Sequence, residues 1–268
     1  MIDVHHHLVC EPGYIGRLLR EMDRLGIERA GLMAMGAMFE RLFVTTGETV
    51  GPLEERDALA ALRAHPDRFF GYVYVRLGCD GAEKVKRWGE QGFRGVKLHI
   101  PKAPYSDEAF FPVYDAARSL GMVCLFHTGL ISAPFPNVRG ERLLSEHTRP
   151  VHVEAVAVEM PDLRIVLAHL GGVWAEEACG MMRLHTNVHA DMSGRLDGWR
   201  RGKPPEWFRE LLFWPGAADK LLFGSDVHCA ELDATIRDQM GIVRALGWDE
   251  RRVKQFASEN ARRLFGLT

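Results

Sequence analysis

Residues 2–9 read Ile-Asp-Val-His-His-His-Leu-Val, an apolar strand pattern interrupted by three consecutive histidines. Side chains at alternate positions of a strand share a face, so we expect His5 and His7 to point together and His6 to point away. A doubly wound nucleotide-binding sheet usually places a Gly-x-Gly-x-x-Gly turn after its first strand, and no such turn follows here. The stretch therefore favours a barrel strand that delivers two imidazoles to one site.

Seven further apolar runs follow this stretch, and amphipathic helical patterns separate them. In the first helical pattern, residues 14–25, apolar side chains recur every three or four positions. Eight strands alternating with helices in about 250 residues are typical of a (β/α)8 TIM barrel, and an open doubly wound α/β sheet is the alternative. The expected strands are 2–9, 29–35, 69–77, 95–100, 122–127, 164–169, 187–193 and 220–226.

Two helical patterns, 232–246 and 250–265, follow the last expected strand, so we expect one helix beyond the barrel repeat. The sequence has no internal linker or low-complexity tract. Its 268 residues, 47% of them hydrophobic, suffice for a large core. We therefore expect residues 1–268 to form a single α/β barrel domain.

The charge balance argues against polyanionic partners. The chain carries 34 Lys and Arg against 36 Asp and Glu, a net charge of -2, and so lacks the basic field that draws proteins to nucleic acid or anionic lipid. The longest apolar stretch, residues 31–39, is about half of a membrane span, and five cysteines without a Cys-x-x-Cys pair favour reduced thiols. We expect a cytoplasmic protein with a small-molecule substrate, compatible with a homo-oligomer.

Polar residues follow the later apolar runs where each strand is expected to end. These residues are Lys97, His99, His127, His169 and Asp226. Barrel enzymes place their active sites at the carboxyl ends of the strands, and strands one and eight become neighbours when a barrel closes. His127 and Asp226 can therefore converge with the two first-strand histidines, and such a set suits Zn(II), and also Fe, Co or Mn.

At this point the sequence resembles the amidohydrolase superfamily, and within it the amidohydrolase 2 group, which contains aminocarboxymuconate semialdehyde decarboxylase-like enzymes. The matching motifs are collinear and span residues 3–266: Asp3-Val4-His5-His6-His7, Gly95-Val96-Lys97-Leu98-His99, His127-Thr128-Gly129, Ala168-His169-Leu170-Gly171-Gly172, Asp191-Met192-Ser193-Gly194, Gly224-Ser225-Asp226 and residues 259–266. The resemblance implies a metal-dependent barrel enzyme with a metal held by His5, His7, His127 and Asp226 and with His169 beside it. Because this group mostly uses one metal, we expect one divalent ion, with zinc preferred.

Two features bear on the details of that resemblance. Family members with two metals bridge them with a carbamylated lysine at the end of strand four, close to Lys97; we favour an uncarbamylated Lys97 that contacts substrate together with His99. Residues 224–228 read Gly-Ser-Asp-Val-His, where an aromatic residue and a proline would be expected after the aspartate. This changed loop leaves the identity of the substrate open.

Hydrolysis of a small carboxylated substrate is the function that we expect first. Metal-activated water would attack the substrate, Asp226 would move its proton, and His169 would stabilise the oxyanion. The alternative is non-oxidative decarboxylation of a small aromatic or muconate-type acid by the same residues. A metal-binding barrel without catalysis and a scaffold protein are two further classes, and the presence of both His169 and Asp226 argues against them.

Three further residues are expected to contact the substrate. Arg139 and Arg195 could pair with a substrate carboxylate in bidentate fashion, and Trp174 could form a wall of the pocket. Cys10 and Cys229 follow His7 and Asp226 by three residues each. We therefore expect these two thiols at the pocket mouth.

Overall fold

The computed structural model describes residues 1–131 and 143–268. Its eight strands are all parallel and follow one another in sequence order around the sheet. Backbone hydrogen bonds from Val4 to Phe223 (3.1 Å) and from Asp226 to His5 (2.7 Å) join the last segment to the first. The strands are β1 (Ile2–His7), β2 (Arg29–Met33), β3 (Phe69–Val75), β4 (Gly95–Leu98), β5 (Val123–Phe126), β6 (Arg164–Leu167), β7 (Val188–Asp191) and β8 (Leu221–Leu222).

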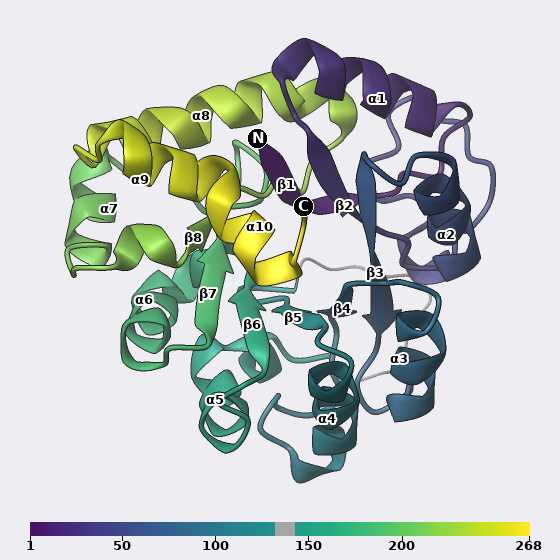
Figure 1. The fold of residues 1–268 in the computed structure, drawn as a ribbon, viewed down its shortest axis with the longest axis horizontal. Coiled ribbons are helices and arrows are strands. Elements are labelled where there is room, and N and C mark those ends of the chain that lie inside the picture. Colours follow the sequence, from purple (N-terminus) through teal and green to yellow (C-terminus); the bar gives the residue numbers. More distant parts are fainter. Residues whose placement is uncertain (132–142) are drawn as a thin grey trace.

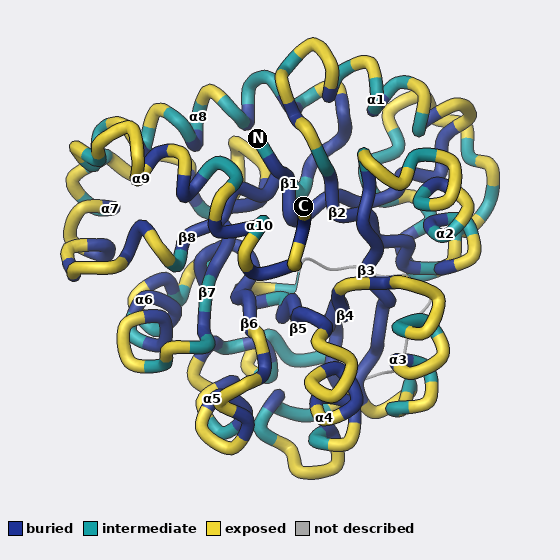
Figure 2. Tube along the Cα trace, viewed as in Figure 1, coloured by how far each residue is buried: buried dark blue, intermediate teal, exposed yellow. Residues whose placement is uncertain are grey.

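Helices form a ring outside these strands, as Figure 1 shows in a view close to the barrel axis. The strands are buried, whereas the outer faces of the helices are exposed (Figure 2). This arrangement confirms the (β/α)8 TIM barrel and excludes the open sheet. The helices are α1 (Tyr14–Leu25), α2 (Glu55–Ala64), α3 (Ala82–Gly89), α4 (Phe111–Ser119), α5 (Glu154–Glu159), α6 (Ala175–Leu184), α7 (Pro205–Leu211), α8 (Leu232–Ala245), α9 (Glu250–Lys254) and α10 (Asn260–Phe265).

One core fills the layer between the strands and the helices, and a second fills the barrel interior. The last helix, α10, covers one end of the barrel (Figure 1). Its Phe265 packs against Phe70 of β3, with ring centroids 4.8 Å apart. This end carries the amino ends of the strands, so α10 closes the barrel opposite the end where barrel enzymes place their sites.

The strands are shorter than the sequence pattern predicts. Each predicted strand runs past its observed carboxyl end, the eighth by four residues and most of the others by two. The chain leaves the sheet there through a backbone that a strand cannot adopt: φ is +55° at Ile100, +60° at His169 and +52° at Asp226. His169 and Asp226 therefore lie on loops just beyond the strands, a correction to the expectation that they end them.

Glycines let large side chains fill the barrel interior. A Cβ atom at Gly95 would lie 2.3 Å from Cδ1 of Tyr72, the residue beside it on β3. The Tyr72 ring is buried and its hydroxyl donates to the Val4 carbonyl (2.7 Å). It is therefore tied in place and has little freedom to move away.

We expect the substitution Gly95→Ala to lower the free energy of unfolding by about 1–3 kcal/mol, the usual effect of overpacking a core. Urea unfolding measures this loss. The matched control is Gly241→Ala in α8, where a Cβ would meet nothing within 4 Å and where alanine should stabilise the helix by about 0.5–1 kcal/mol. A wild-type unfolding midpoint for Gly95→Ala would contradict this view of the core.

Candidate active site

A cavity of about 540 Å³ opens at the carboxyl end of the barrel. Its floor carries the polar residues that the sequence singles out: His5, His7, Lys97, His99, His127, His169 and Asp226. Its wall is mostly apolar and is formed by Phe39, Leu42, Phe43, Leu130, Val173 and Trp199, with Arg195 and Asp197 beside them. A polar floor under an apolar wall is the usual form of a small-molecule site.

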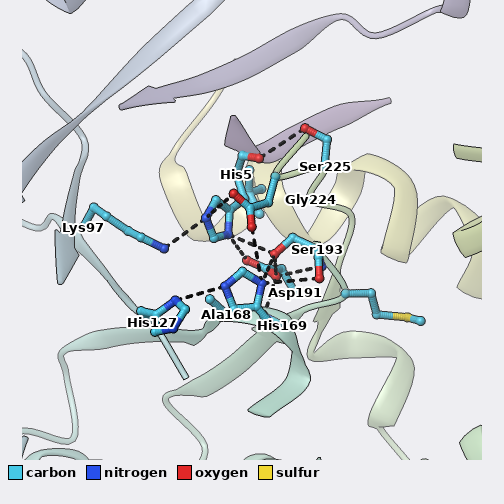
Figure 3. A network of polar contacts seen from close by, with 12 residues as sticks. His5, Lys97, His127, Ala168, His169, Asp191, Ser193, Gly224 and Ser225 are labelled. Carbon is cyan, nitrogen blue, oxygen red and sulfur yellow. Dashed lines mark hydrogen bonds and ion pairs between the residues drawn. The ribbon is translucent and has the colours of Figure 1, made fainter. Parts of the chain in front are cut away.

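His5 is oriented by a carboxylate behind it (Figure 3). Its Nδ1 donates to Oδ2 of the fully buried Asp191 (2.9 Å). Asp191 also accepts from the backbone amides of His169 and Ser193, at 2.9 Å each. Because Nδ1 carries the proton, the lone pair of His5 lies on Nε2. His7 also lines the cavity, and His6 points the other way, toward Ser225 and Tyr14, as strand alternation predicts.

Asp226 is held in a backbone conformation that a non-glycine residue rarely adopts. The hydrogen bond from its amide to the His5 carbonyl stabilises it there. Its carboxylate lies 3.0 Å from Nε2 of His7, 3.7 Å from Nε2 of His5 and 3.8 Å from Nδ1 of His169. Burial opposes ionisation, but the imidazoles of His5 and His7 outweigh it and hold the pKa of Asp226 well below its usual value. Asp226 is therefore an anion at neutral pH.

His169 also has a positive φ, and its amide is fixed by Asp191. Its Nδ1 lies 2.8 Å from Oγ of Ser193, and its Nε2 lies 3.1 Å from Nδ1 of His127. The ring of His99 lies against that of His127, with centroids 3.8 Å apart. These three histidines form one row along the cavity floor.

Two groups of described residues have ligand atoms that all lie within 4.8 Å of one another: His5, His7 and Asp226, and His5, His169 and Asp191. The first group faces the cavity, and its imidazole and carboxylate donors are those that zinc and manganese accept. In the second group Asp191 hydrogen-bonds to His5, the arrangement that commonly orients a metal-binding histidine. His127 belongs to neither group, because its nitrogens face His169 and the Leu130 carbonyl.

Lys97 lies on β4, and its side chain extends into the same floor (Figure 3). Its Nζ donates to Nε2 of His5 at 3.0 Å. Burial lowers the pKa of Lys97 to about 8. The amine thus faces the very lone pair of His5 that a metal would use.

Four histidines of the floor are neutral because they are buried. Burial lowers the pKa of His7 and of His169 from 6.5 to about 4, and it lowers that of His99 and His127 well below the usual value. Neutral imidazoles keep the lone pair that metal binding and proton acceptance require.

These shifts predict how the stability of the metal-free protein depends on pH. Between pH 6.5 and 4 the unfolded chain binds protons at His7 and His169 that the folded chain does not, so stability is fully present above pH 6.5 and falls as the pH approaches 4. We expect a loss of about 2 kcal/mol per histidine at pH 5. Urea unfolding with chelator present at pH 7 and pH 5 measures it, and His7→Gln should flatten the dependence. Equal stability at both pH values would contradict the assignment.

The remaining residues expected at the site lie in different places. Arg195 lines the cavity and pairs with Asp197 at 3.1 Å. Trp174 is not among the lining residues, because it directly precedes α6 and lies under the guanidinium of Arg149, which is 5.9 Å from its ring centroid. Arg139 lies outside the described residues.

The thiols expected at the cavity mouth are elsewhere. Cys10 and Cys229 are free but buried, and neither lines this cavity. The expectation that they form the mouth is wrong, because Cys10 lies against Leu53 and Cys229 lies against Tyr14 of α1.

From the sequence we assign no role to the residues that hold the floor histidines in place, Asp191 and Ser193, or to most of the residues of the wall. Asp191 and Ser193 belong to a motif that the sequence shows, and the end of the seventh strand is the signal that could have assigned them a role. Trp199 lines the cavity and Trp174 does not, and the indole N–H of Trp199 donates to the Ser193 carbonyl (2.9 Å). The wall residues Phe39 and Phe43 carry no sequence signal beyond their position in a long connection.

Fold and floor together define a class, a barrel enzyme with histidine and carboxylate groups suited to a metal at the carboxyl ends of its strands. The chain belongs to the amidohydrolase family, whose model matches residues 2–267. Proteins of this family are metal-dependent enzymes that include hydrolases and decarboxylases. The resemblance read from the sequence is therefore confirmed.

Solved structures share the fold at low sequence identity. An uncharacterized TIM-barrel protein from Bordetella bronchiseptica is 17% identical, with a TM-score of 0.75 over 100% of this chain and 98% of its own. A manganese-bound 5-carboxyvanillate decarboxylase from Novosphingobium aromaticivorans is 16% identical, with a TM-score of 0.60 over 99% and 96%. A dihydroorotase from Saccharomyces cerevisiae is 13% identical, with a TM-score of 0.62 over 100% and 84%. A comparison with curated protein sequences gives no match.

No helix in the described part of the chain combines the length and the apolar character that crossing a membrane requires.

Proposed function

We propose that the protein hydrolyses a small carboxylated organic substrate at this site, with one divalent metal ion, zinc, as cofactor. The observation that carries the proposal is the position of Asp226, whose carboxylate lies within 4 Å of His5, His7 and His169 on the cavity floor. One carboxylate can therefore take part in metal binding and also exchange a proton with the reacting molecules.

The metal would be held by His5, His7 and Asp226, whose ligand atoms already lie together. We propose His127 as the fourth ligand, as the family resemblance implies, although its nitrogens face His169 and the Leu130 carbonyl here. When bound, it supplies Lewis acidity that lowers the pKa of water to about 7 and polarises a carbonyl group. Asp226, an anion at neutral pH, accepts the proton of the attacking water and passes it to the leaving group. His169 then stabilises the oxygen on which negative charge develops.

Substrate binding would use the rest of the cavity. Lys97 and His99 are buried on the floor and contact the polar end of the substrate. Arg195 at the mouth pairs with a substrate carboxylate, and we propose Arg139 for the same task. A cavity of about 540 Å³ matches a small molecule.

Decarboxylation of a small aromatic acid is the second candidate, and the wall favours it. Phe39, Phe43 and Trp199 bring three aromatic rings to one cavity, and aromatic rings pack well against a flat ring. With the same residues, Asp226 or His169 would protonate the substrate carbon as CO2 leaves. The similar fold of a 5-carboxyvanillate decarboxylase is consistent with this chemistry.

Isotope labelling separates the two reactions. Zinc-loaded protein is incubated in ¹⁸O-water with a panel of small lactones and amides that carry a carboxylate, and in parallel with hydroxybenzoates labelled with ¹³C in the carboxyl group. We expect one ¹⁸O atom in the product acid, and no turnover by the Asp226→Ala variant. Release of ¹³CO2 without ¹⁸O incorporation from any substrate of the panel would overturn hydrolysis in favour of decarboxylation.

A further inference from the structure

A buried carboxylate lies behind the cavity, where neither proposed reaction uses it. Glu11 follows β1 by four residues, and its side chain is 0% exposed. A buried carboxylate is costly unless it is paired and hydrogen-bonded, so its partners indicate its role. Burial would raise the pKa of Glu11, but the amides of Thr45 and Thr46 lower it to about 2, and the group is ionised.

One oxygen of Glu11 holds the segment that forms the cavity wall. Oε1 accepts from the backbone amide of Thr45, from its hydroxyl (3.0 Å) and from the amide of Thr46 (3.1 Å). Phe43, two residues before Thr45, has a φ of +62°, and its ring lies 5.6 Å from that of His7. A positive φ at phenylalanine costs about 1–3 kcal/mol and persists only where the surroundings enforce it. The bonds to Glu11 begin two residues after this strained residue.

The other oxygen of Glu11 holds the loop that carries Asp226. Oε2 is paired with Arg17 of α1 and lies 3.4 Å from Nε2 of His228. Nδ1 of His228 accepts from the Ala230 amide (3.1 Å). Nε2 therefore carries the proton and donates to Glu11. His228 is the residue that stands where the family resemblance would place a proline, two positions after Asp226.

We propose that Glu11 is a positioning residue that fixes the wall residue Phe43 and the loop of Asp226 relative to each other. The wall and the loop are about 180 residues apart in the chain, and one carboxylate bonds to both. The inference rests on the proposed function, because it assigns to Glu11 an effect on substrate binding in the cavity and no effect on metal binding. It explains why this loop carries a histidine, since a proline side chain could donate no hydrogen bond.

The test compares Glu11→Gln with wild type and with Glu55→Gln. Glutamine has the same shape as glutamate, but one of its terminal groups is an N–H₂ group, which would face the hydrogen-bond donors that contact one of the two Glu11 oxygens. Glu55 is a matched control because it is also buried and paired, but its partner, Lys84 at 2.9 Å, lies on α3 and not on the cavity wall or the loop of Asp226. The readouts are amide exchange in peptides covering residues 37–50, metal content, and the Kd for 4-nitrobenzoate from tryptophan quenching.

For Glu11→Gln we expect about 10-fold faster exchange in residues 37–50, unchanged exchange in β5, wild-type metal content, and about 10-fold weaker 4-nitrobenzoate binding, equivalent to one lost hydrogen-bonding contact. If Glu11 acts through Phe43, the double variant with Phe43→Ala binds no more weakly than Phe43→Ala alone. Thr45→Val, which removes only one donor, should shift exchange in the same direction and provides the test if Glu11→Gln fails to fold.

Three results would each overturn the positioning role. The first is a wild-type rate of amide exchange in residues 37–50 of the folded Glu11→Gln variant. The others are additive effects of Glu11→Gln and Phe43→Ala on 4-nitrobenzoate binding, and an effect of Glu55→Gln as large as that of Glu11→Gln. Failure of the proposed function can be distinguished from failure of this inference. A wild-type protein that holds no metal would disprove the metal mechanism, and the amide-exchange comparison would still decide the role of Glu11.

Discussion

The substitution Asp226→Ala is expected to remove the bound metal and to lower kcat/KM by at least about four orders of magnitude. The reason is that in the proposed mechanism one carboxylate serves both as metal ligand and as proton acceptor, and the loss of either role has a large effect by itself. The carboxylate lies within 4 Å of three histidines on the cavity floor. Elemental analysis of the purified variant and steady-state kinetics on the substrate found by isotope labelling measure the two losses.

The matched control is Asp162→Ala, which removes an exposed carboxylate whose partner is Arg118, on the outside of the barrel. It should retain metal and activity. An Asp226→Ala variant with wild-type metal content and turnover would remove Asp226 from the mechanism.

The second large effect is expected for His169→Asn. This variant should keep its metal near the wild-type level and lose about two to four orders of magnitude in turnover, the usual scale for a general acid, general base or oxyanion group. The proposed metal ligands are three other histidines and one carboxylate, so His169 is not needed to hold the metal. Its two ring nitrogens contact Ser193 and His127. Metal content, kcat and KM are measured together.

His65→Asn is the control for the loss of an imidazole, because His65 directly follows α2 and does not line the cavity. If His169→Asn loses its metal as completely as His5→Ala, then His169 is a ligand and the catalytic role assigned to it is wrong.

The sequence predicts the barrel well because its signals are local. Apolar runs of β-strand length alternate with helical patterns, and eight such units in this length are typical of a closed parallel barrel. The strand starts are accurate to within one residue, but the carboxyl ends are predicted too long. At these ends hydrogen bonds to distant groups, such as the one from the His169 amide to Asp191, override the strand pattern.

The polar floor is predictable because its residues follow strands, and parallel strands bring their carboxyl ends to one place. The cavity wall and the residues behind the floor cannot be predicted in this way. Trp199 and Phe43 enter the cavity from long connections whose path depends on contacts such as those of Glu11 with Thr45 and Thr46. Such contacts join residues more than 30 positions apart and leave no periodic signal. The sequence therefore predicts Trp174 in the cavity wall and gives no indication of Trp199.

The metal content of the active protein tests the central claim most directly. Protein is treated with a chelator, assayed, reloaded with zinc or manganese, and assayed again, with elemental analysis at each stage. We predict one divalent ion per chain, loss of activity when it is removed, and recovery when it returns. Two ions per chain would point to a carbamylated Lys97 that bridges them, whereas full activity in protein that contains no metal would contradict the account.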